Sequence, residues 1–193
     1  MLISPQYQEQ QRAMHSDEEH PYGTTARKYG ETVSELVNLM GVKHLLDYGC
    51  GKRRSLMETF RPDHECRVQC YDPGVPEYSD PPTPAEMVVC IDVLEHIEPM
   101  YIEDVLDHLE DLTESLLFAT VHTKPAGKIL PDGRNAHLIQ KPAEWWLPKI
   151  MERFTLKGFN QRDEKVFEVL RLPKGNSIRN GWGMDANKGF KHF

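Results

Sequence analysis

The stretch LLDYGCGK, residues 45–52, decides the expected fold of this chain. A short apolar strand, expected over residues 43–48, places Asp47 near its carboxyl end. The strand runs into a Gly-Cys-Gly turn at residues 49–51, where two glycines two positions apart let the backbone pass close to a ligand. A helix is expected to follow over residues 54–60. Because a plain strand-to-helix turn has the same pattern, the flanking sequence has to decide between a binding loop and a simple connection.

Strands and helices are expected to alternate on both sides of this stretch. Some segments repeat apolar residues with helical spacing, and others contain short continuous apolar runs that are typical of buried strands. The expected elements are helices over residues 31–40, 100–113 and 142–154, strands over residues 67–71, 87–91 and 115–121, and a strand pair within residues 154–172. Pro148 lies inside the last helix and predicts a kink or a break there. This alternation predicts an α/β fold with a mostly parallel sheet and a C-terminal antiparallel hairpin.

Length and composition are those of a single globular domain. The chain has 193 residues, of which 39% are hydrophobic and 27% charged, and its net charge is −7. The acidic balance argues against a broad basic surface for duplex nucleic acid. No apolar run has the length of a membrane span and no signal-peptide pattern is present, so we expect a cytoplasmic protein with no membrane partner. The four cysteines are expected to be reduced residues of the core: Cys50, Cys66, Cys70 and Cys90.

Acidic groups follow two other expected strands. Asp72 comes directly after the strand over residues 67–71 and stands 21 residues after Gly51. This spacing is near the roughly 20 residues at which an acidic side chain meets ribose hydroxyls in dinucleotide-binding folds. The segment IDVLEHIEP, residues 91–99, adds further ionisable groups after the strand over residues 87–91. Since parallel strands place their carboxyl ends at one edge of a sheet, we expect these groups and the glycine turn around one ligand site.

In this order, the three segments resemble the motifs of the class I S-adenosylmethionine (SAM)-dependent methyltransferases. LLDYGCGK resembles their first motif, YDP at residues 71–73 the acidic end of their second strand, and CIDVLEHIEP at residues 90–99 the segment after their fourth strand. Two more segments, YGTTARKYG at residues 22–30 and LPDGRNAHLI at residues 130–139, resemble segments of phage and bacterial members. The family fold is Rossmann-like. For a phage-encoded chain, the expected location is the cytoplasm of the host.

The resemblance implies an enzyme that transfers a methyl group from SAM to an oxygen or nitrogen of an acceptor. It divides the chain into a lead-in or lid over residues 1–30, a methyltransferase domain over residues 31–172 and a flexible tail over residues 173–193. Asp72 would accept hydrogen bonds from the ribose hydroxyls, and Lys28 would pair with the methionine carboxylate unless it is only a solvated lysine. The implied cofactor-binding set is Lys28, Asp47, Gly49, Gly51, Asp72, Asp92 and Val93.

The chain departs from the family pattern at two places. Arg53 stands where a third glycine is usual. Between residues 73 and 87, where family members usually fit a helix and a further strand, the segment GVPEYSDPPTPAE contains four prolines that exclude such a helix. We therefore expect that one strand and one helix are lost, which leaves six strands with the strand over residues 67–71 at an edge.

Histidines near the same edge are the candidate catalytic residues. These are His96, His122 and His137, and each is a candidate base that would take a proton from the molecule to be methylated. The alternative for each is a structural histidine held by hydrogen bonds. Their grouping, together with Asn135, favours methyl transfer over an alternative class of protein. That alternative is a SAM-binding module, such as a sensor or an accessory subunit, that holds the cofactor without using it.

A candidate divalent-metal site is formed by Glu95 and His96, which follow the strand over residues 87–91, and by His137 from the loop before the last helix. Carboxylate and imidazole ligands suit Zn²⁺, Mn²⁺, Fe²⁺ or Co²⁺, and a set richer in carboxylates would admit Mg²⁺. The pattern resembles the Glu-x-x-Glu-His segment, with a later His, of metal-dependent 2′-O-methyltransferases that act on the 3′ ends of small RNAs. Asp92 replaces the first Glu of that pattern. The alternative is that Glu95 and His96 cap the next helix or bond locally.

The methyl acceptor is not legible in the sequence. Because no separate recognition domain is expected, the acceptor is a small molecule or the accessible end of a larger one. The basic tail after Pro173 carries Trp182 and Phe190, which would suit a nucleic-acid strand. A disordered solubilising tail has the same composition.

Overall fold

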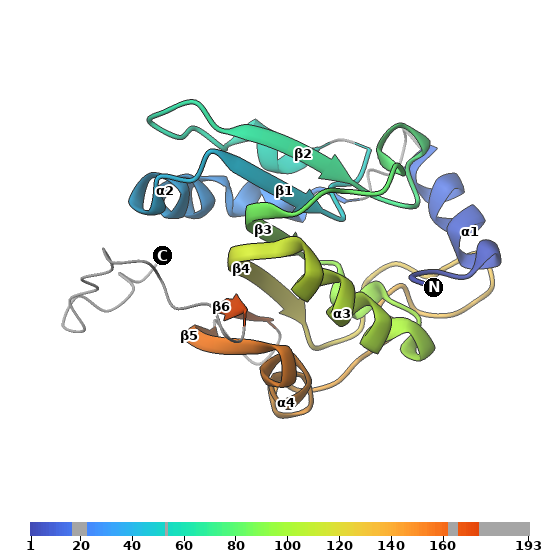
Figure 1. The fold of residues 1–193 in the computed structure, drawn as a ribbon. Coiled ribbons are helices and arrows are strands. Elements are labelled where there is room, and N and C mark those ends of the chain that lie inside the picture. The colour runs from blue at the N-terminus through green and yellow to red at the C-terminus, as the bar shows by residue number, and fades with distance from the viewer. Residues whose placement is uncertain (17–22, 53, 162–165, 174–193) are drawn as a thin grey trace.

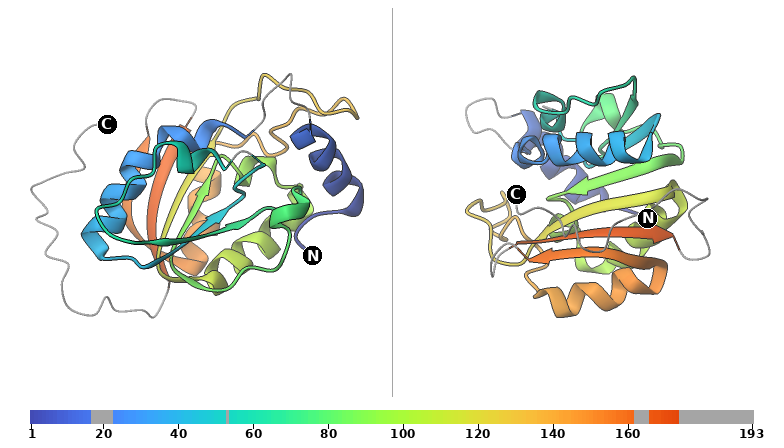
Figure 2. Two further views of the ribbon diagram at one scale, coloured as in Figure 1. Left: turned by 90° about the horizontal axis from the view of Figure 1, so that it is seen from above. Right: turned by 90° about the vertical axis from the view of Figure 1, so that its left-hand side faces the viewer.

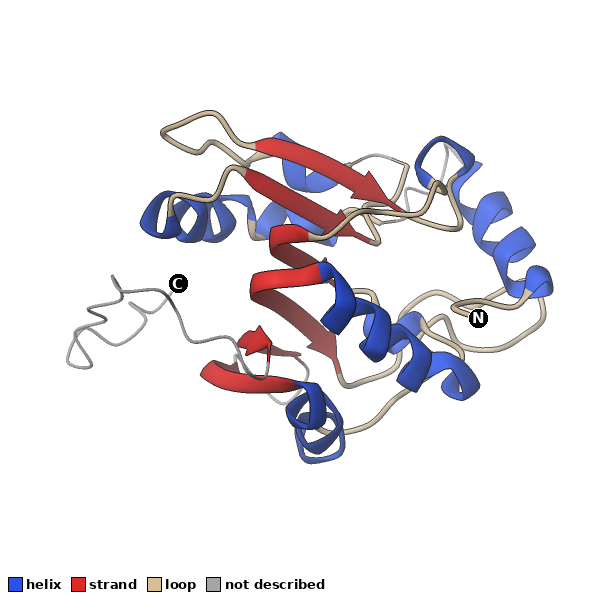
Figure 3. Cartoon of the chain, in the orientation of Figure 1, coloured by secondary structure: helices blue, strands red, loops and turns tan. Residues whose placement is uncertain are grey.

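A computed structural model describes residues 1–16, 23–52, 54–161 and 166–173. Figures 1 and 3 show how the helices and strands of these residues are arranged. The helices are α1 (Pro5–Ser16), α2 (Gly30–Met40), α3 (Ile102–Leu112) and α4 (Ala143–Arg153). The strands are β1 (His44–Tyr48), β2 (Arg67–Tyr71), β3 (Ala85–Ile91), β4 (Thr113–His122), β5 (Phe154–Gln161) and β6 (Val166–Pro173).

The six strands form one sheet in the order β2-β1-β3-β4-β6-β5. Strands β2, β1, β3 and β4 are parallel to one another, whereas β6 runs antiparallel to β4 and pairs antiparallel with β5 (Figure 1). The prediction of a mostly parallel α/β sheet of six strands with a C-terminal antiparallel hairpin is confirmed. Strand β2 lies at an edge, as expected.

The proline-rich link between β2 and β3 explains why the sheet ends at β2. Between these two strands the chain forms only one 3₁₀ turn, Pro76–Tyr78, and adds neither an α-helix nor a strand. Proline has no backbone N–H to donate and fixes φ, so a segment with four prolines cannot build either element. The link folds back instead, and the backbone N–H of Asp72 donates to the carbonyl of Tyr78 at 2.8 Å.

Helices cover both faces of the sheet, which explains the continuous apolar runs in its central strands. Helix α2 packs on one face, and α3 and α4 pack on the other (Figure 2). Leu45 and Leu46 are adjacent on β1, both fully buried, and belong to opposite faces. Val88 and Val89 do the same on β3. Because successive side chains of a strand point to opposite faces, a strand covered on both sides has to be apolar throughout.

Two expectations about helices are corrected. The helix expected over residues 54–60 is only a 3₁₀ helix over Ser55–Glu58, because a segment this short before Pro62 cannot sustain α-helical hydrogen bonding. Helix α4 runs without a break from Ala143 to Arg153 although it contains Pro148. Pro148 and Glu144, whose carbonyl loses its helical donor, are both exposed, so water can satisfy that carbonyl.

Several expectations concern residues outside the described part of the chain. These are Arg53 at the third glycine position, residues 162–165 within the expected strand pair, and the basic segment from residue 174 onward. Among the residues that the structure describes, no helix combines the length and the apolar character needed to cross a membrane.

Candidate functional site

The turn after β1 is held close to the end of β2. The backbone N–H groups of Gly49 and Cys50 both donate to the carbonyl of Tyr71, at 2.7 and 3.2 Å. Gly49 and Gly51 have φ values of 80° and 62°, a region that favours glycine. A Cβ atom on Gly49 would clash with the side chain of Val93, so the turn passes directly over the segment that follows β3. Thus the predicted residues Gly49, Gly51 and Val93 lie together.

Asp72 joins this turn through its side chain. It is buried directly after β2, and its Oδ2 accepts a hydrogen bond from the N–H of Gly51 at 2.9 Å. Its Oδ1 accepts one from the N–H of Gly74 at 2.8 Å. These bonds fix both carboxylate oxygens at the carboxyl edge of the sheet, where open α/β folds bind ligands.

Asp47 and Lys28 lie elsewhere. Asp47 is buried at the end of β1 beneath the turn, and its Oδ2 has no hydrogen-bond partner among the described residues. Burial is the main cause that raises the pKa of Asp47 to about 8, and nearby Cys70 and Asp72 add to it. Lys28 is exposed at the end of a 3₁₀ helix and does not line the cavity described next. Asp47 is therefore buried near Asp72 without lining the cavity, and Lys28 does not line it either.

A cavity of about 110 Å³ lies at this edge, between the sheet and helix α1. Six of the predicted residues line it: Gly49, Gly51, Asp72, Asp92, Val93 and His96. Helix α1 contributes Tyr7, Gln11 and His15 from the opposite side. Nε2 of His15 lies 3.9 Å from Oδ2 of Asp72, and burial lowers the pKa of His15. The cavity therefore has a polar end at Asp72 and a second end near His96.

Asp92, His96 and His137 gather at the second end. Their potential ligand atoms all lie within 4.8 Å of one another. Nδ1 of His96 lies 2.8 Å from the carbonyl oxygen of Ala136, and Nδ1 of His137 lies 2.6 Å from that of Lys124. Because a carbonyl oxygen only accepts, these contacts place a proton on each Nδ1 and leave Nε2 as the basic nitrogen of the neutral ring.

Burial keeps both of these rings neutral. It lowers the pKa of His96 to about 4 and also lowers the pKa of His137. The two rings stand nearly perpendicular, with centres 4.8 Å apart. His122, on the same edge at the end of β4, lies 4.9 Å from His137 between ring centres and does not line the cavity. The three predicted histidines are thus neighbours, and His96 is the one that faces the cavity.

Glu95 is not among the residues whose potential ligand atoms group together at this edge, and its expected role as a metal ligand stays a prediction. Its side chain is fully buried, and Oε1 accepts a hydrogen bond from the N–H of His122 at 2.5 Å. Burial first, and then the charge of Asp92, raises the pKa of Glu95 well above its ordinary value. Within the 3₁₀ turn Leu94–His96, adjacent side chains point in different directions, so Glu95 turns into the core. Asp92 takes its place beside the two imidazoles.

The loop after β4 brings His137 to this edge. Oδ1 of Asn135 accepts hydrogen bonds from the N–H groups of Ala126, at 2.9 Å, and His137, at 3.0 Å. The N–H of Ile139 donates to the carbonyl of Glu95, which fastens the loop to the segment after β3. Asn135 therefore positions the loop, and it lies behind the cavity.

Residues 1–30 are expected to form a lead-in or lid, but the residues through which α1 lines the cavity were not among the predicted site residues. Tyr7, Gln11 and His15 stand four residues apart and occupy one helical face toward the cavity. The hydroxyl of Tyr7 donates to the carbonyl of His96 at 2.9 Å. The spacing of four residues between Tyr7, Gln11 and His15 was the available signal. The polar residues between them hid this helical face in the sequence.

The chain has no match among protein-family models and none among curated proteins. Solved structures are similar in three dimensions. N-methyltransferase NodS from Bradyrhizobium japonicum WM9, in complex with S-adenosylhomocysteine (SAH), matches with a TM-score of 0.56 and 14% identity, over 86% of this chain and 98% of that chain.

Two other solved structures are similar over most of their length. The 1,6-didemethyltoxoflavin-N1-methyltransferase from Burkholderia thailandensis, with bound 1,6-didemethyltoxoflavin and SAH, has a TM-score of 0.59 and 13% identity over 90% of this chain and 92% of that chain. Magnesium protoporphyrin IX methyltransferase from Synechocystis PCC 6803, with bound SAH, has a TM-score of 0.52 and 15% identity over 88% and 95%. At such low identities the likeness concerns the fold. The chain therefore has the Rossmann-like α/β fold of the class I SAM-dependent methyltransferases.

Proposed function

We propose that this protein is a SAM-dependent methyltransferase that acts on an oxygen or nitrogen of a small molecule. One observation carries the proposal. The glycine turn after β1 and the Asp72 carboxylate after β2 are hydrogen-bonded to each other, at 2.9 Å between Gly51 N and Asp72 Oδ2, on one wall of a cavity. Backbone that approaches a ligand closely and a fixed carboxylate beside it suit a nucleoside with free ribose hydroxyls.

The residues present fit such a cofactor. Asp72 would hold the ribose hydroxyls, and Gly49 and Gly51, where a side chain would fill the space, would lie along the methionine part. The buried Oδ2 of Asp47 lacks a partner among the described residues, and its carboxyl lies near that of Asp72. When bound, SAM supplies an activated methyl group, so the protein mainly has to align the acceptor with it.

Residues at the other end of the cavity would handle the acceptor. His96 lines the cavity and is neutral at physiological pH, because burial lowers its pKa to about 4. Its neutral imidazole is therefore able to accept a hydrogen bond from an acceptor hydroxyl or amine, although a pKa this low makes it a weak base. His122 and His137 stand behind it and would tune its position and proton affinity.

The enclosure by α1 supports a small acceptor. Leu2, Ile3 and Tyr7 form an apolar wall opposite the sheet, and Glu98 adds a carboxylate near the entrance. Among the structures with this fold, the 1,6-didemethyltoxoflavin-N1-methyltransferase has 1,6-didemethyltoxoflavin and SAH bound.

A second candidate is a metal-assisted O-methyltransferase, and the arrangement of Asp92, His96 and His137 favours it. One carboxylate and two imidazoles, each imidazole oriented through Nδ1 by a backbone carbonyl, form a donor set suited to Zn²⁺, Mn²⁺, Fe²⁺ or Co²⁺. A metal bound there would lower the pKa of an acceptor hydroxyl. Asp92, with φ of 61°, adopts an uncommon left-handed backbone conformation in this cluster.

Calorimetry with SAM and SAH tests the proposed function. Wild type should bind either compound at one site. Asp72→Ala should weaken binding by ~1–3 kcal/mol, because ribose hydroxyls lose a charged acceptor. Asp80→Ala is the matched control, since Asp80 is an exposed carboxylate in the same link and does not line the cavity. Thermal melts of both variants separate loss of binding from loss of fold.

Two outcomes would contradict the proposal at different levels. If wild type binds neither SAM nor SAH at millimolar concentration, the cofactor assignment is wrong. If it binds both but transfers no labelled methyl group to any compound in acceptor pools, as read by mass spectrometry, the alternative of a SAM-binding module without transfer is favoured.

A further inference from the structure

Two cysteines adjoin the candidate cofactor site without lining its cavity. Cys50 is the central residue of the glycine turn and is buried, and Cys70 lies on β2, two residues before Asp72, and is partly exposed. The two side chains interact, since each shifts the pKa of the other, upward for Cys50 and downward for Cys70. The backbone N–H of Cys50 also donates to the carbonyl of Tyr71, so the two cysteines are held together by main chain and side chain.

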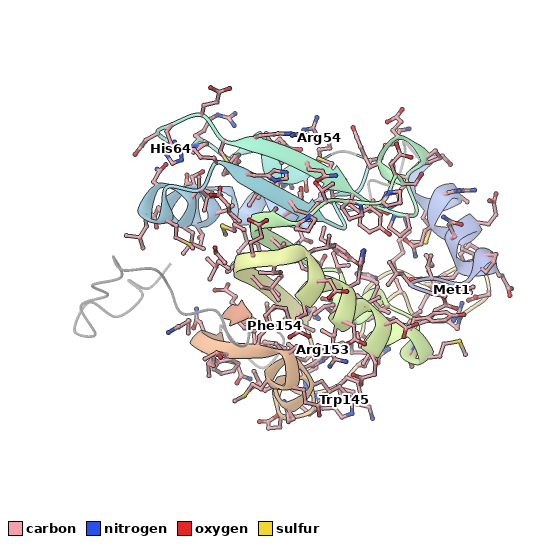
Figure 4. The ribbon with its side chains drawn as sticks, viewed as in Figure 1. Met1, Arg54, His64, Trp145, Arg153 and Phe154 are labelled. Atoms are coloured by element: carbon pink, nitrogen blue, oxygen red, sulfur yellow. The ribbon has the colours of Figure 1, made fainter. Side chains whose placement is uncertain are left out.

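Arg54 adds a positive charge to this pair. Its Nε donates to Sγ of Cys70 at 3.0 Å, and its guanidinium lies 5.8 Å from the ring centre of Tyr78. Figure 4 shows Arg54 next to β2. Its φ of 48° is uncommon for a residue with a side chain. A charged donor therefore contacts the sulfur of Cys70 directly.

This environment favours the thiolate of Cys70. The interaction with Cys50 and the charge of Arg54 outweigh partial burial and lower the pKa of Cys70 to about 6. The buried carboxyl of Asp47 lies near Cys70, and its own pKa is raised to about 8, so it is largely protonated at neutral pH. Thiolate, rather than thiol, is the form that reacts with oxidants and alkylating agents.

The other cysteines provide an internal comparison. Cys66 is partly exposed next to the same strand, but burial and the nearby Glu86 raise its pKa. Cys90 is fully buried in the core, and its pKa is also raised. Of the four, Cys70 alone combines exposure with a lowered pKa.

We propose that Cys70 and Cys50 form a reversible oxidation site, in which a hydroperoxide converts the two thiols into a disulfide. The Cys70 thiolate attacks one oxygen of hydrogen peroxide, the O–O bond breaks, and Cys70 becomes a sulfenic acid as hydroxide leaves and takes up a proton. The sulfur of Cys50 then attacks the Cys70 sulfur, the S–O bond breaks, and the Cys50 proton leaves with that oxygen as water. Two thiols and one peroxide give one disulfide and two waters, and a dithiol reductant reverses the reaction.

The disulfide would act on the cofactor site, a consequence that rests on the proposed function. A covalent S–S bond is shorter than a non-bonded contact between two sulfurs, so Cys50 has to move toward β2. Its neighbour Gly49 packs directly against Val93, and Gly51 binds the Asp72 carboxylate. A shift of Cys50 disturbs both contacts, and the oxidised protein should bind SAM and SAH more weakly.

Alkylation kinetics and disulfide mapping test the oxidation site without any cofactor. At pH 7, iodoacetamide should modify Cys70 roughly fivefold faster than Cys66, as the larger thiolate fraction outweighs the lower nucleophilicity of a more acidic thiol. Arg54→Gln should slow modification of Cys70 but not of Cys66. Arg67→Gln, which removes an exposed arginine from the same strand, is the matched control.

Peroxide treatment then identifies the product. Wild type should yield a peptide pair linked through Cys50 and Cys70, and dithiothreitol should reverse the link. Cys50→Ser should stop at the sulfenic acid, which dimedone traps on Cys70. Equal reactivity of Cys70 and Cys66, no effect of Arg54→Gln, or a disulfide that involves Cys66 would each overturn the proposal.

SAH titration of reduced and oxidised protein tests the consequence. The dissociation constant should rise by about tenfold on oxidation and return after reduction. Equal SAH affinity of the reduced and oxidised protein would show that oxidation does not affect the cofactor site. It would not contradict the formation of the disulfide. Failure of the reduced protein to bind SAH would contradict the proposed function instead, and the mapping alone would then decide the oxidation site.

Discussion

The backbone conformation of Asp92 helps to determine where its carboxylate lies. Asp92 follows β3 with φ of 61°, and its N–H lies near Thr120, 3.1 Å from the hydroxyl oxygen and 3.3 Å from the carbonyl oxygen. These contacts fix the chain where it leaves the sheet. The carboxylate then lies with His96 and His137, whereas Glu95, three residues later, is buried in the core.

Metal analysis tests the role proposed for this cluster. After chelation and reloading with Zn²⁺, Mn²⁺, Fe²⁺ or Co²⁺, wild type should retain about one ion per chain, as measured by plasma mass spectrometry. His96→Gln and His137→Gln should each lose it, because two ligands hold such an ion poorly. His64→Gln serves as control, since His64 is a partly buried histidine that bonds the carbonyl of Val42 away from the site.

Glu95→Gln adds a second test of the ligand set. Glu95 is not among the three grouped residues but lies close to Asp92, so this variant should keep the ion unless Glu95 is itself a ligand. Near-zero occupancy in wild type and variants alike, with methyl transfer insensitive to chelator, would remove the metal from the mechanism. His96 would then remain as a base or a hydrogen-bonding residue.

At the scale of elements, the turn after β1 matters because three strands converge on it. It bonds to the end of β2 through Tyr71, contacts Val93 after β3, and ends β1 itself. Gly41, which ends α2, has a similar φ of 64° but no heavy atom within 4 Å of where a Cβ would stand. The two glycines thus share a backbone requirement and differ in packing.

Substitution of these two glycines separates backbone strain from packing. Gly41→Ala should destabilise the protein by ~1–2 kcal/mol, which is the cost of a left-handed conformation for a residue with a side chain. Gly49→Ala should cost ~2–5 kcal/mol, because overpacking against Val93 adds to that strain. Urea unfolding measures both values. A similar loss of unfolding free energy in the two variants would show that the turn and Val93 can move apart at little cost.

At the scale of the whole molecule, α1 covers the cavity from a region far away in sequence. Oγ of Ser4 donates to Glu98 at 2.8 Å, and Nε2 of Gln8 donates to the carbonyl of Pro73 at 2.8 Å. The terminal ammonium of Met1, which Figure 4 labels, contacts Asp104 of α3 at 3.0 Å. These contacts hold the N-terminal part of the helix, and we propose that the helix acts as a lid over the cavity.

The size of the cavity supports this lid role. Its volume of about 110 Å³ is smaller than the roughly 300–1,000 Å³ of ordinary small-molecule pockets. A nucleoside cofactor would therefore require α1 to move. The helix packs in its own apolar cluster, around Tyr7, Met14, Leu130 and Ala136, apart from the two cores that flank the sheet. Such a separation lets α1 shift without disrupting the sheet.

Removal of residues 1–16 tests this lid. The shortened protein should keep a cooperative thermal transition, because both sheet cores are intact, while its dissociation constant for SAH rises about tenfold. Tyr7→Phe, which removes only the hydrogen bond to the His96 carbonyl, should have a smaller effect. Unchanged SAH affinity after the deletion would show that α1 does not cover the bound cofactor.

Much of the fold was predictable because its signals are local. Proline between β2 and β3 excludes further regular structure whatever surrounds it, which gave the six-stranded sheet with β2 at its edge. The glycine turn and Asp72 were predicted to meet because parallel strands end at one edge, and they do. The short segment after the turn was mistaken for an α-helix, because its apolar pattern does not reveal how few hydrogen bonds it can form.

The sequence by itself determined the sheet, its edge, and the turn and carboxylate at the candidate cofactor site, since strand direction, proline and glycine act through the backbone. Only the tertiary structure decided that Asp92 joins His96 and His137, that Lys28 stays away, and that α1 closes the cavity. Those outcomes depend on side-chain direction in a 3₁₀ turn and on packing between segments some ninety residues apart, as in the bond from Tyr7 to His96. No local pattern encodes such contacts, because they form only when the whole chain is compact.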